Sequence, residues 1–345
     1  MKKINHLINK FVFLPLLAGP QRKKNYSTTS YLFNNLLPWQ ITGLTDGEGG
    51  FYCSILKTGS GITGFRVKLE FKVVQKSHSE KVLVNLQKYF SCGSVVIDNR
   101  KTDTKKYHVS SLSDILNIII PHFEAYPCLT SKFLNFKDWK NIAFLIKNKE
   151  HLTEKGLQKI REISSNMNTG RSFLEKYEYL KNSLNIDSEG NANYKLPEHW
   201  VQTFIDGEGM FYNYIALNEN SNSCEAATKK NKITIDSSLE IAQGNHDVFI
   251  LLALKQFFNG GYIKPKYNVN SIIECKESRS VNRFILRDSK IIIDFVNKYP
   301  MLTRKQLDYF DWKTIVELKN NGLHKSPEGL NLIKEIKAKM NSKRD

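Results

Sequence analysis

The sequence has few cysteines, and they form no pattern that binds a metal or crosslinks a small domain. Their number is odd, they are scattered along the chain, and no two have the Cys-x-x-Cys spacing of a zinc ribbon. This excludes a disulfide framework and favours a reducing compartment. The five are Cys53, Cys92, Cys128, Cys224 and Cys275.

Long apolar runs are also missing. The longest, from Phe11 to Ala18, is interrupted by Pro15 and is far shorter than the roughly 20 residues that a membrane-spanning helix needs. The sequence therefore predicts a protein without a membrane partner. Of its 345 residues, 41% are hydrophobic and 11% aromatic, which is enough for a sizeable core and excludes disorder throughout.

Acidic residues are absent from the first 45 positions, where the charged side chains are all basic: Lys2, Lys3, Lys10, Arg22, Lys23 and Lys24. Such a segment resembles a mitochondrial transit peptide, so residues 1–34 are predicted to be a leader and the location a mitochondrion. A disordered basic tail, or the remnant of an upstream reading frame, is the alternative. Removing these six charges from the net charge of +17 still leaves a surplus of 11, which predicts a polyanionic partner.

The chain contains an internal repeat. Residues 126–171 align without a gap onto residues 299–344, and 21 of the 46 positions are identical, far more than unrelated segments share. Upstream, the sequence Asp-Gly-Glu-Gly at 46–49 recurs at 206–209, and Gln75 recurs as Gln243. We therefore interpret the chain as one unit duplicated and fused, with a first unit at 35–169, a polar linker at 170–195 and a second unit at 196–345.

Hydrophobic periodicity predicts the order αββαββα, followed by a further helix, in each unit, and hence an α+β fold. A helix is expected to begin at Pro38, and at Pro197 in the second copy, and to stop at the glycines that follow. In the first unit we expect strands at 51–56, 65–75, 95–98 and 106–110, and helices at 80–90, 114–123, 132–147 and 154–167. Thr130, Thr153 and Ser326 are the predicted helix caps.

The segments ITGLTDGEG at 41–49 and VQTFIDGEG at 201–209 resemble the signature of the LAGLIDADG homing endonucleases. More narrowly, the chain resembles the single-chain, two-motif members encoded in mitochondrial group I introns, over roughly Leu36 to Arg344. The resemblance implies a monomer with an internal pseudo-dimer, in which antiparallel sheets form a DNA-binding saddle and the motif helices pack at the centre. It implies cleavage of double-stranded DNA across the minor groove at a long, asymmetric site of roughly 20 base pairs, in support of intron mobility.

The composition of the motif agrees with this resemblance. Gly43, Gly47 and Gly207 would let two helices approach closely, which brings Glu48 and Glu208 together at the two C-terminal ends. Two carboxylates at two negative helix ends repel each other unless a cation is bound. The family assigns metal binding to the last acidic residue of each motif, so we predict Mg²⁺, or Mn²⁺, at Glu48 and Glu208, with Gly47 and Gly207 beside it.

Other motif-associated residues have predicted supporting roles. Asp46 and Asp206 are interpreted as mainly structural, accepting backbone hydrogen bonds, with a secondary metal or solvent role. Gln75 and Gln243 end the second strand of each unit, where the family often positions water or phosphate.

Lys132 and Lys305 stand at matching helix starts, where the family commonly supplies a basic residue near the cleaved phosphate. The alternatives are an ordinary strand-end amide for the glutamines and a solvated surface lysine for the lysines.

The polar faces of the two sheets are the predicted DNA-binding surfaces. In the first unit the candidates are Arg66, Lys68, Glu70, Lys72, Arg100, Lys101, Lys105 and Lys106. In the second unit they are Asn213, Lys232, Thr234, Asp236, Ser238, Lys264, Lys266, Arg279 and Arg283.

The second motif departs from the family pattern at two positions. Thr203 stands where the family usually has Gly, and Gln202 where a small or apolar residue is usual; a β-branched residue there is expected to loosen or offset the helix pair. Two other functions compete with the nuclease. One is a maturase that binds its own intron RNA and assists splicing, and the other is a catalytically silent DNA-binding derivative; Glu48 and Glu208, which neither requires, favour the nuclease.

Overall fold

The computed structural model describes residues 35–59, 62–218, 232–265 and 281–341. The predicted leader at 1–34 and the candidates Lys266 and Arg279 lie outside these ranges. Within them, no helix has the length and apolar character needed to cross a membrane.

The first copy begins with helix α2 (Pro38–Glu48), which passes directly into strand β1. Pro38 occupies the first turn, where a missing backbone N–H costs nothing. The remaining elements are β1 (Gly49–Lys57), β2 (Phe65–Lys76), α3 (Glu80–Phe90), β3 (Ser94–Asn99), β4 (Thr104–Val109), α4 (Leu112–Asp114), α5 (Ile120–Ala125), α6 (Lys132–Lys147) and α7 (Glu154–Ser165). A π-helical turn, Ile115–Ile119, joins α4 to α5.

The second copy repeats this order after helix α8 (Phe173–Ser183). Its elements are α9 (Glu198–Glu208), β5 (Gly209–Asn218), β6 (Lys232–Gly244), α10 (Val248–Phe257), β7 (Tyr262–Pro265), β8 (Val281–Leu286), α11 (Ser289–Lys298), α12 (Lys305–Asn320) and α13 (Pro327–Ala338). The expected α+β order is confirmed in both copies, within one to four residues at most boundaries. The motif helices, however, continue to Glu48 and Glu208 instead of stopping before the motif glycines.

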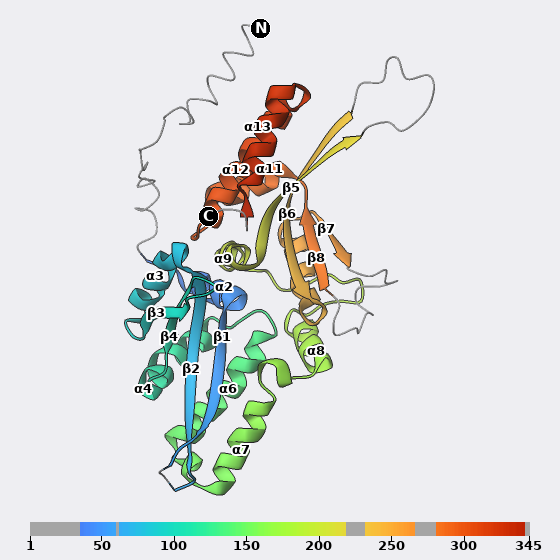
Figure 1. The fold of residues 1–345 in the computed structure, drawn as a ribbon. Coiled ribbons are helices and arrows are strands. Elements are labelled where there is room, and N and C mark those ends of the chain that lie inside the picture. Colours follow the sequence, from blue (N-terminus) through green and yellow to red (C-terminus); the bar gives the residue numbers. More distant parts are fainter. Residues whose placement is uncertain (1–34, 60–61, 219–231, 266–280, 342–345) are drawn as a thin grey trace, which may run out of the picture. The chain divides into compact units, whose positions relative to one another are not determined.

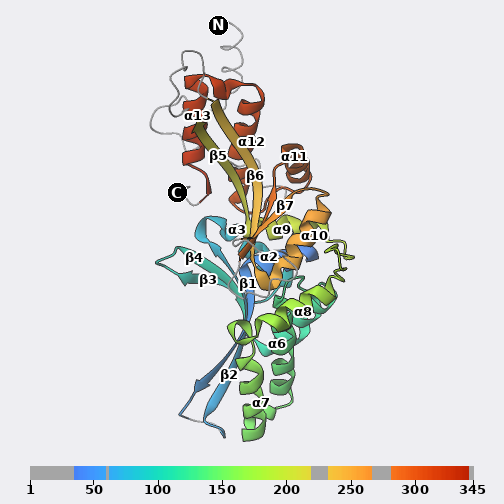
Figure 2. The ribbon, with the colours of Figure 1, turned by 90° about the vertical axis from the view of Figure 1, so that its right-hand side faces the viewer.

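Each copy contains a four-stranded antiparallel sheet, with strand order β1-β2-β4-β3 in the first and β5-β6-β8-β7 in the second. Helices cover one face of each sheet, and α2 and α9 lie side by side between the two sheets (Figures 1 and 2). The alternation of strand β2 explains why helices cover one face of the sheet only. Leu69, Phe71 and Val73 are buried under the helices, while Arg66 and Lys68 lie on the opposite, exposed face.

Each copy has its own apolar core, and each core is contacted by one leucine of the other copy, at equivalent positions. Leu129 of the first copy belongs to the core of the second, and Leu302 of the second packs against the core of the first. The segment expected to be a polar linker also contributes. It contains α8, from which Tyr177 and Leu180 enter the core of the second copy. Sequence periodicity alone missed this helix because only two of its residues, Tyr177 and Leu180, are buried.

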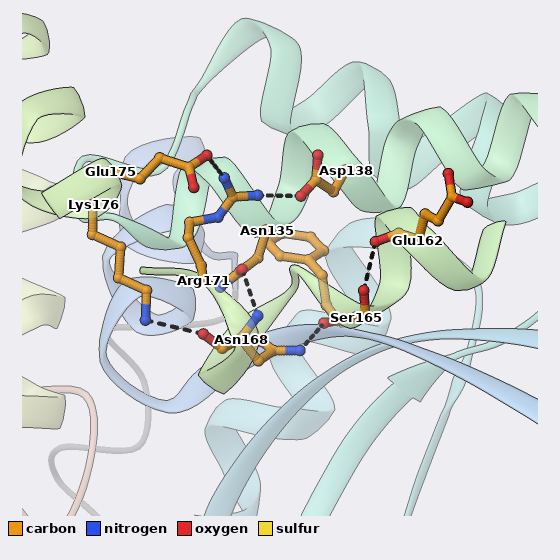
Figure 3. A network of polar contacts seen from close by, with 9 residues as sticks. Asn135, Asp138, Glu162, Ser165, Asn168, Arg171, Glu175 and Lys176 are labelled. Carbon is orange, nitrogen blue, oxygen red and sulfur yellow. Dashed lines mark hydrogen bonds and ion pairs between the residues drawn. The ribbon is translucent and has the colours of Figure 1, made fainter. Parts of the chain in front are cut away.

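A polar network fixes the start of that segment against the first copy (Figure 3). Arg171 pairs with Asp138 of α6 and with Glu175 of α8. Next to it, the backbone N–H of Asn168 donates to Asn135 Oδ1 at 2.8 Å, and the Asn168 amide donates to the Phe51 carbonyl of edge strand β1 at 3.3 Å. The network thereby joins α6, α8 and the sheet.

The helix caps agree in part with expectation. Thr153 accepts a hydrogen bond from the Gly156 N–H, and Ser326 accepts one from the Gly329 N–H, as predicted. Thr130 is different: its hydroxyl accepts a 3.3 Å bond from Lys132 N but stands one residue before the N-cap, Ser131. The Thr130 hydroxyl also donates its own proton to Asp46, as described below.

His122 gives the first copy a pH-dependent stability. Its ring is packed against Phe123 and Phe90, its Nε2 atom is buried without a partner among the described residues, and burial lowers its pKa to about 4. The unfolded chain therefore binds a proton between about pH 6.5 and pH 4 that the folded chain does not. Stability contributed by the neutral ring is complete above the unfolded pKa and is lost as the pH falls toward 4.

We predict that the free energy of unfolding of the wild type decreases by up to about 3 kcal/mol across this window because of His122 alone. His122→Phe should remove this part of the pH dependence, and the second copy already carries Phe295 at the equivalent position. Urea unfolding of both proteins at several pH values measures the difference. Parallel pH profiles for the two proteins would contradict the prediction.

Candidate functional site

The backbones of α2 and α9 touch near their C-terminal ends. A Cβ atom placed on Gly47 would lie 3.2 Å from Gly207 Cα, and one placed on Gly207 would lie 3.1 Å from Gly47 Cα. The Cβ atom placed on Gly207 would also lie 3.4 Å from Glu48 Cγ, and the Cβ atom placed on Gly47 would lie 3.9 Å from Glu208 Cγ. The predicted close approach is confirmed, and each glutamate lies against the neighbouring helix.

Thr203 does not loosen the helix pair, contrary to expectation. Its Oγ1 atom lies only 2.2 Å from the point where a Cβ on Gly43 would be, so it fills the space that the missing side chain leaves. The hydroxyl donates to the His199 carbonyl of its own helix at 3.1 Å. A β-branched residue is accommodated on one helix because its partner is glycine.

Gln202 is accommodated by hydrogen bonding. Its amide donates to the Pro300 carbonyl at 2.6 Å, and its Oε1 atom accepts from Gln40 of α2 at 2.9 Å. At the equivalent position of the first copy, Thr42 donates to the Tyr126 carbonyl at 2.8 Å. Both departures from the family pattern thus belong to a satisfied interface.

Asp46 and Asp206 are buried and tie each motif helix to a later segment of its own copy. Asp46 accepts hydrogen bonds from Leu129 N at 2.8 Å and from Thr130 Oγ1 at 2.6 Å, and also from Trp200 Nε1 of the other copy at 2.8 Å. Asp206 accepts equivalent bonds from Leu302 N and the Thr303 hydroxyl. Burial raises the pKa of both carboxyls, whereas these donors lower it. This geometry agrees with a structural role, through loop donors rather than the helix-end N–H groups expected.

Lys132 and Lys305 hold the C-terminal ends of the motif helices. Lys132 Nζ donates to the carbonyls of Thr45, Asp46 and Gly49 at 2.7, 3.0 and 2.6 Å. Lys305 Nζ donates to the carbonyls of Ile205, Gly207 and Gly209, at 3.0 and 3.2 Å for the first two; Ile205 and Gly209 are equivalent to Thr45 and Gly49, whereas Gly207 stands one residue after the equivalent of Asp46.

An ammonium group has three N–H donors, and all three are used in each lysine. Neither lysine is a solvated surface residue, and a direct bond to phosphate would require one of these contacts to break.

Glu48 and Glu208 are the last residues of these helices and form no ion pair within the described residues. Burial raises the pKa of both; Lys305 and Lys132 oppose the rise, and the charge of Glu48 adds to it at Glu208. A hydrogen bond from Gln243 stabilises ionised Glu208. The equivalent amide of the first copy, Gln75 Nε2, is buried and lacks a partner among the described residues.

These observations fit a divalent cation. Two crowded carboxylates lie where two helix C-terminal ends meet, and oxygen ligands suit Mg²⁺ or Mn²⁺. No group of three or more His, Cys, Asp or Glu gathers within the described ranges, so water or substrate oxygens would complete the shell. The Gly207 carbonyl already accepts a bond from Lys305, and direct metal ligation by Gly47 or Gly207 stays a prediction.

Sequence reasoning missed residues that join the two copies. Ser79, before α3, accepts a bond from Arg304 N of the second copy at 3.3 Å, and Asp247, before α10, accepts one from Ser131 N of the first at 2.9 Å. Both residues are typical helix caps and occupy equivalent positions 168 residues apart. That pairing is the signal that could have identified them.

The structure assigns most DNA-binding candidates to the sheet face that the helices leave open. Lys106 shares this face with Glu70, which it contacts at 2.9 Å, and Arg283 contacts Glu240 at 3.1 Å in the second sheet. Strand register also places Lys68, Lys72, Thr234, Asp236, Ser238 and Lys264 on these faces, and Lys232 is the first residue of β6. Arg100 and Lys101 are exposed in the turn between β3 and β4.

Two candidates lie on the opposite, helix-covered face, so their predicted placement was wrong. Asn213 is 2% exposed, accepts a bond from Ser237 Oγ at 2.6 Å and packs near Met340. Lys105 is paired in register with Gln75 and forms a 2.7 Å ion pair with Glu80 at the start of α3. Both errors come from assigning a polar residue to the polar face without fixing its register.

A family model described as LAGLIDADG endonuclease matches residues 41–143 and 203–316, which include the C-terminal parts of both motif helices, with Glu48 and Glu208. The chain belongs to the LAGLIDADG endonuclease family.

Several fungal proteins are similar to this LAGLIDADG protein. "Probable intron-encoded endonuclease 2" of Neurospora crassa is 29% identical over 95% of the chain and 72% of its own length. "Probable intron-encoded endonuclease 3" of the same organism is 31% identical over 90% of the chain, which spans 55% of that relative. A Saccharomyces cerevisiae relative, 24% identical over 95% of the chain and 64% of its own length, is named an uncharacterized mitochondrial protein.

Two solved structures of LAGLIDADG homing endonucleases resemble the fold. I-LtrWI bound to target DNA has a TM-score of 0.72 and 30% identity, covering 89% of this chain and 98% of its own. I-SmaMI, bound to an uncleaved DNA target in the presence of calcium ions, has a TM-score of 0.71 and 26% identity, covering 89% and 99%. The expected family and two-unit fold are confirmed.

Gly43 and Gly47, the two glycines of the first motif helix, should differ in how well they tolerate substitution by alanine. Gly43→Ala puts a methyl group 2.2 Å from Thr203 Oγ1 and 2.5 Å from the Trp200 carbonyl, so we expect a loss of about 3 kcal/mol in stability. Gly47→Ala meets its nearest atom at 3.2 Å and gains helix propensity, so its stability should stay within about 1 kcal/mol of the wild type. Thermal or urea unfolding compares them; equal losses would contradict the contact geometry.

Removing either helix-capping lysine should destabilise the protein even without metal or DNA. Lys132→Met and Lys305→Met each leave carbonyls at a helix C-terminus without a cation, and we expect losses of about 2 kcal/mol. Lys137→Met, at an exposed position of α6, is the matched control and should be neutral. Unchanged unfolding of both capping variants, with cleavage alone reduced, would instead indicate contact with phosphate.

Proposed function

We propose that this LAGLIDADG protein is a site-specific endonuclease that recognises a long, asymmetric duplex site of roughly 20 base pairs. It hydrolyses one phosphodiester in each strand across the minor groove, supporting intron mobility. The observation that carries the proposal is the placement of Glu48 and Glu208 at the touching ends of α2 and α9. Family membership and the DNA-bound relatives support it.

Glu48 and Glu208 are the proposed ligands of the divalent cation. When bound, the cation would lower the pKa of a water molecule and stabilise the leaving 3′ oxygen. The protein's own groups prepare the site for this chemistry. Lys132 and Lys305 fix the helix ends that carry the glutamates, and Gln243 holds the Glu208 carboxylate. Gln75 and Gln243 are proposed to position water or phosphate oxygens.

The same arrangement supports a single-chain enzyme. Both motifs lie on one chain and contact each other, so a second copy of the protein is not needed to complete the site. The intron-encoded fungal relatives support an origin in an intron and a mitochondrial location. Recognition uses the open faces of the two sheets, and a monomer bound to an asymmetric site follows from their unequal side chains.

Cleavage of duplex DNA tests the proposal. The substrate is a duplex carrying the intronless junction of the host gene, or a site selected from a randomised library, with Mg²⁺, Mn²⁺ or Ca²⁺. We expect the duplex to be cut into two shorter duplexes with Mg²⁺ or Mn²⁺, and at least a 100-fold loss of cleavage for Glu48→Gln and Glu208→Gln. DNA binding by both variants should be retained, because the glutamines keep the shape of the site.

Control variants separate ligand loss from disruption of the fold. Asp187→Asn changes a carboxylate in the segment between the copies, remote in sequence from both motifs, and should cleave at the wild-type rate. Binding without cleavage by the wild type, or undiminished cleavage by the Glu48→Gln/Glu208→Gln double variant, would overturn the proposed mechanism.

A further inference from the structure

The open face of the first sheet is rich in cations. Its strands carry Arg66, Lys68, Lys72, Lys76 and Lys106 on this face, against the acidic residues Glu70 and Asp98. Lys106 and Lys72 pair with these acids, at 2.9 Å to Glu70 and 3.9 Å to Asp98. Arg66 and Lys68 are exposed and have no ion-pair partner within the described residues.

Strand β6 of the second sheet lacks the cations of β2 at the equivalent described positions. The repeat pairs Arg66 with Thr234, Lys68 with Asp236, Lys72 with Glu240 and Lys76 with Gly244, since the two strands share the offset of 168 that relates Gln75 to Gln243. Among the described side chains of the strands on this face, two cations, Lys264 and Arg283, balance two acids, Asp236 and Glu240, and Arg287, directly after β8, lies over the Tyr262 ring at 5.6 Å. Arg283 is paired with Glu240 at 3.1 Å.

Aromatic side chains replace small polar ones on the same second face. Register places Tyr214 where the first sheet has Ser54, and Tyr262 where it has Ser94. Tyr214 is 49% exposed and Tyr262 is 40% exposed; neither ring belongs to an apolar core, and Arg287 lies over the Tyr262 ring at 5.6 Å. Large exposed rings on a strand face, at positions where the duplicate has serine, indicate an apolar contact surface for a ligand.

We propose that the two sheets read their halves of the DNA site by different physical means, an inference that rests on the DNA binding proposed above. The first sheet supplies the phosphate-neutralising, salt-dependent part of the affinity through Arg66 and Lys68. The second sheet contacts the 5-methyl groups of thymine in the major groove through Tyr214 and Tyr262, and therefore prefers a thymine-rich half-site.

The energetics of DNA binding make the two modes separable. Each phosphate that a cation neutralises releases counterions and adds about 0.9 to the slope of log K against log salt concentration. Contact between a tyrosine ring and a thymine methyl releases no counterion, so it adds affinity without changing that slope. The thymine methyl is absent from deoxyuridine, which otherwise presents the same hydrogen-bonding groups.

The first experiment measures binding to a mixed-sequence 30-bp duplex by fluorescence anisotropy, at several KCl concentrations and without divalent metal. We expect the Arg66→Ala/Lys68→Ala double variant to lower the slope by about 2. The matched variant Lys264→Ala/Arg283→Ala removes the same charge from the second sheet and should lower it by less than about 1, because Arg283 is already paired. Equal changes in slope would overturn the proposed division.

The second experiment uses a target obtained by selection, with thymine replaced by deoxyuridine in one half at a time. Replacement under the second sheet should weaken binding of the wild type about tenfold, and replacement under the first sheet by less than about twofold. Tyr214→Ser/Tyr262→Ser restores the residues of the first copy and should abolish the difference. Equal responses of the two halves, or a difference that persists in this variant, would refute thymine contact.

Both experiments read binding alone, so their failure is distinct from failure of the proposed endonuclease. A protein that cleaves with Mg²⁺ but responds alike in both halves would disprove the division between the sheets and leave the endonuclease standing. A protein that shows the unequal slopes and deoxyuridine effects but never cleaves would retain the division and lose the nuclease.

Discussion

The backbone contact between α2 and α9 determines where the two glutamates of the site lie. Helices can touch at this distance only where side chains are missing, and Gly47 and Gly207 meet at that point. Because both helices end one residue later, the contact forces two glutamates into one small volume. Their mutual repulsion, at the negative ends of two helix dipoles, is the feature that a bound cation relieves.

Hydrogen bonds and lysines hold this unfavourable arrangement in place. Asp46 and Asp206 fasten each motif helix to the segment that precedes α6 or α12, and Lys132 and Lys305, the first residues of α6 and α12, cap the ends of the motif helices. Asp46 with Lys132, and Asp206 with Lys305, thus attach each motif helix to the later helix of its own copy. Cationic ammonium groups near the glutamates also limit how far burial raises their pKa, which keeps carboxylates available for metal binding.

The duplication made much of this predictable. Alternation in β2 gave the buried and open faces correctly, and the motif glycines correctly indicated a tight helix pair. What could not be derived were contacts between residues far apart in the chain. Thr203 looks unfavourable in its own helix, and only the position of Gly43 across the interface explains it. Lys132 looks like a surface residue because the carbonyls it binds lie more than 80 positions earlier in the chain. Asn213 was misplaced for a local reason, since a polar residue can be buried where Ser237 satisfies it.

The fit of Thr203 into the space beside Gly43 also makes the two halves complementary and no longer interchangeable. Two copies of the first half would leave a gap at this point, and two copies of the second half would bring one hydroxyethyl group against another. The fused gene has thereby acquired the kind of size-matched pair that distinguishes a heterodimer from either homodimer. Half-exchange between this protein and a relative accordingly requires that residues 43 and 203 be transferred as a pair, whichever half supplies the DNA specificity.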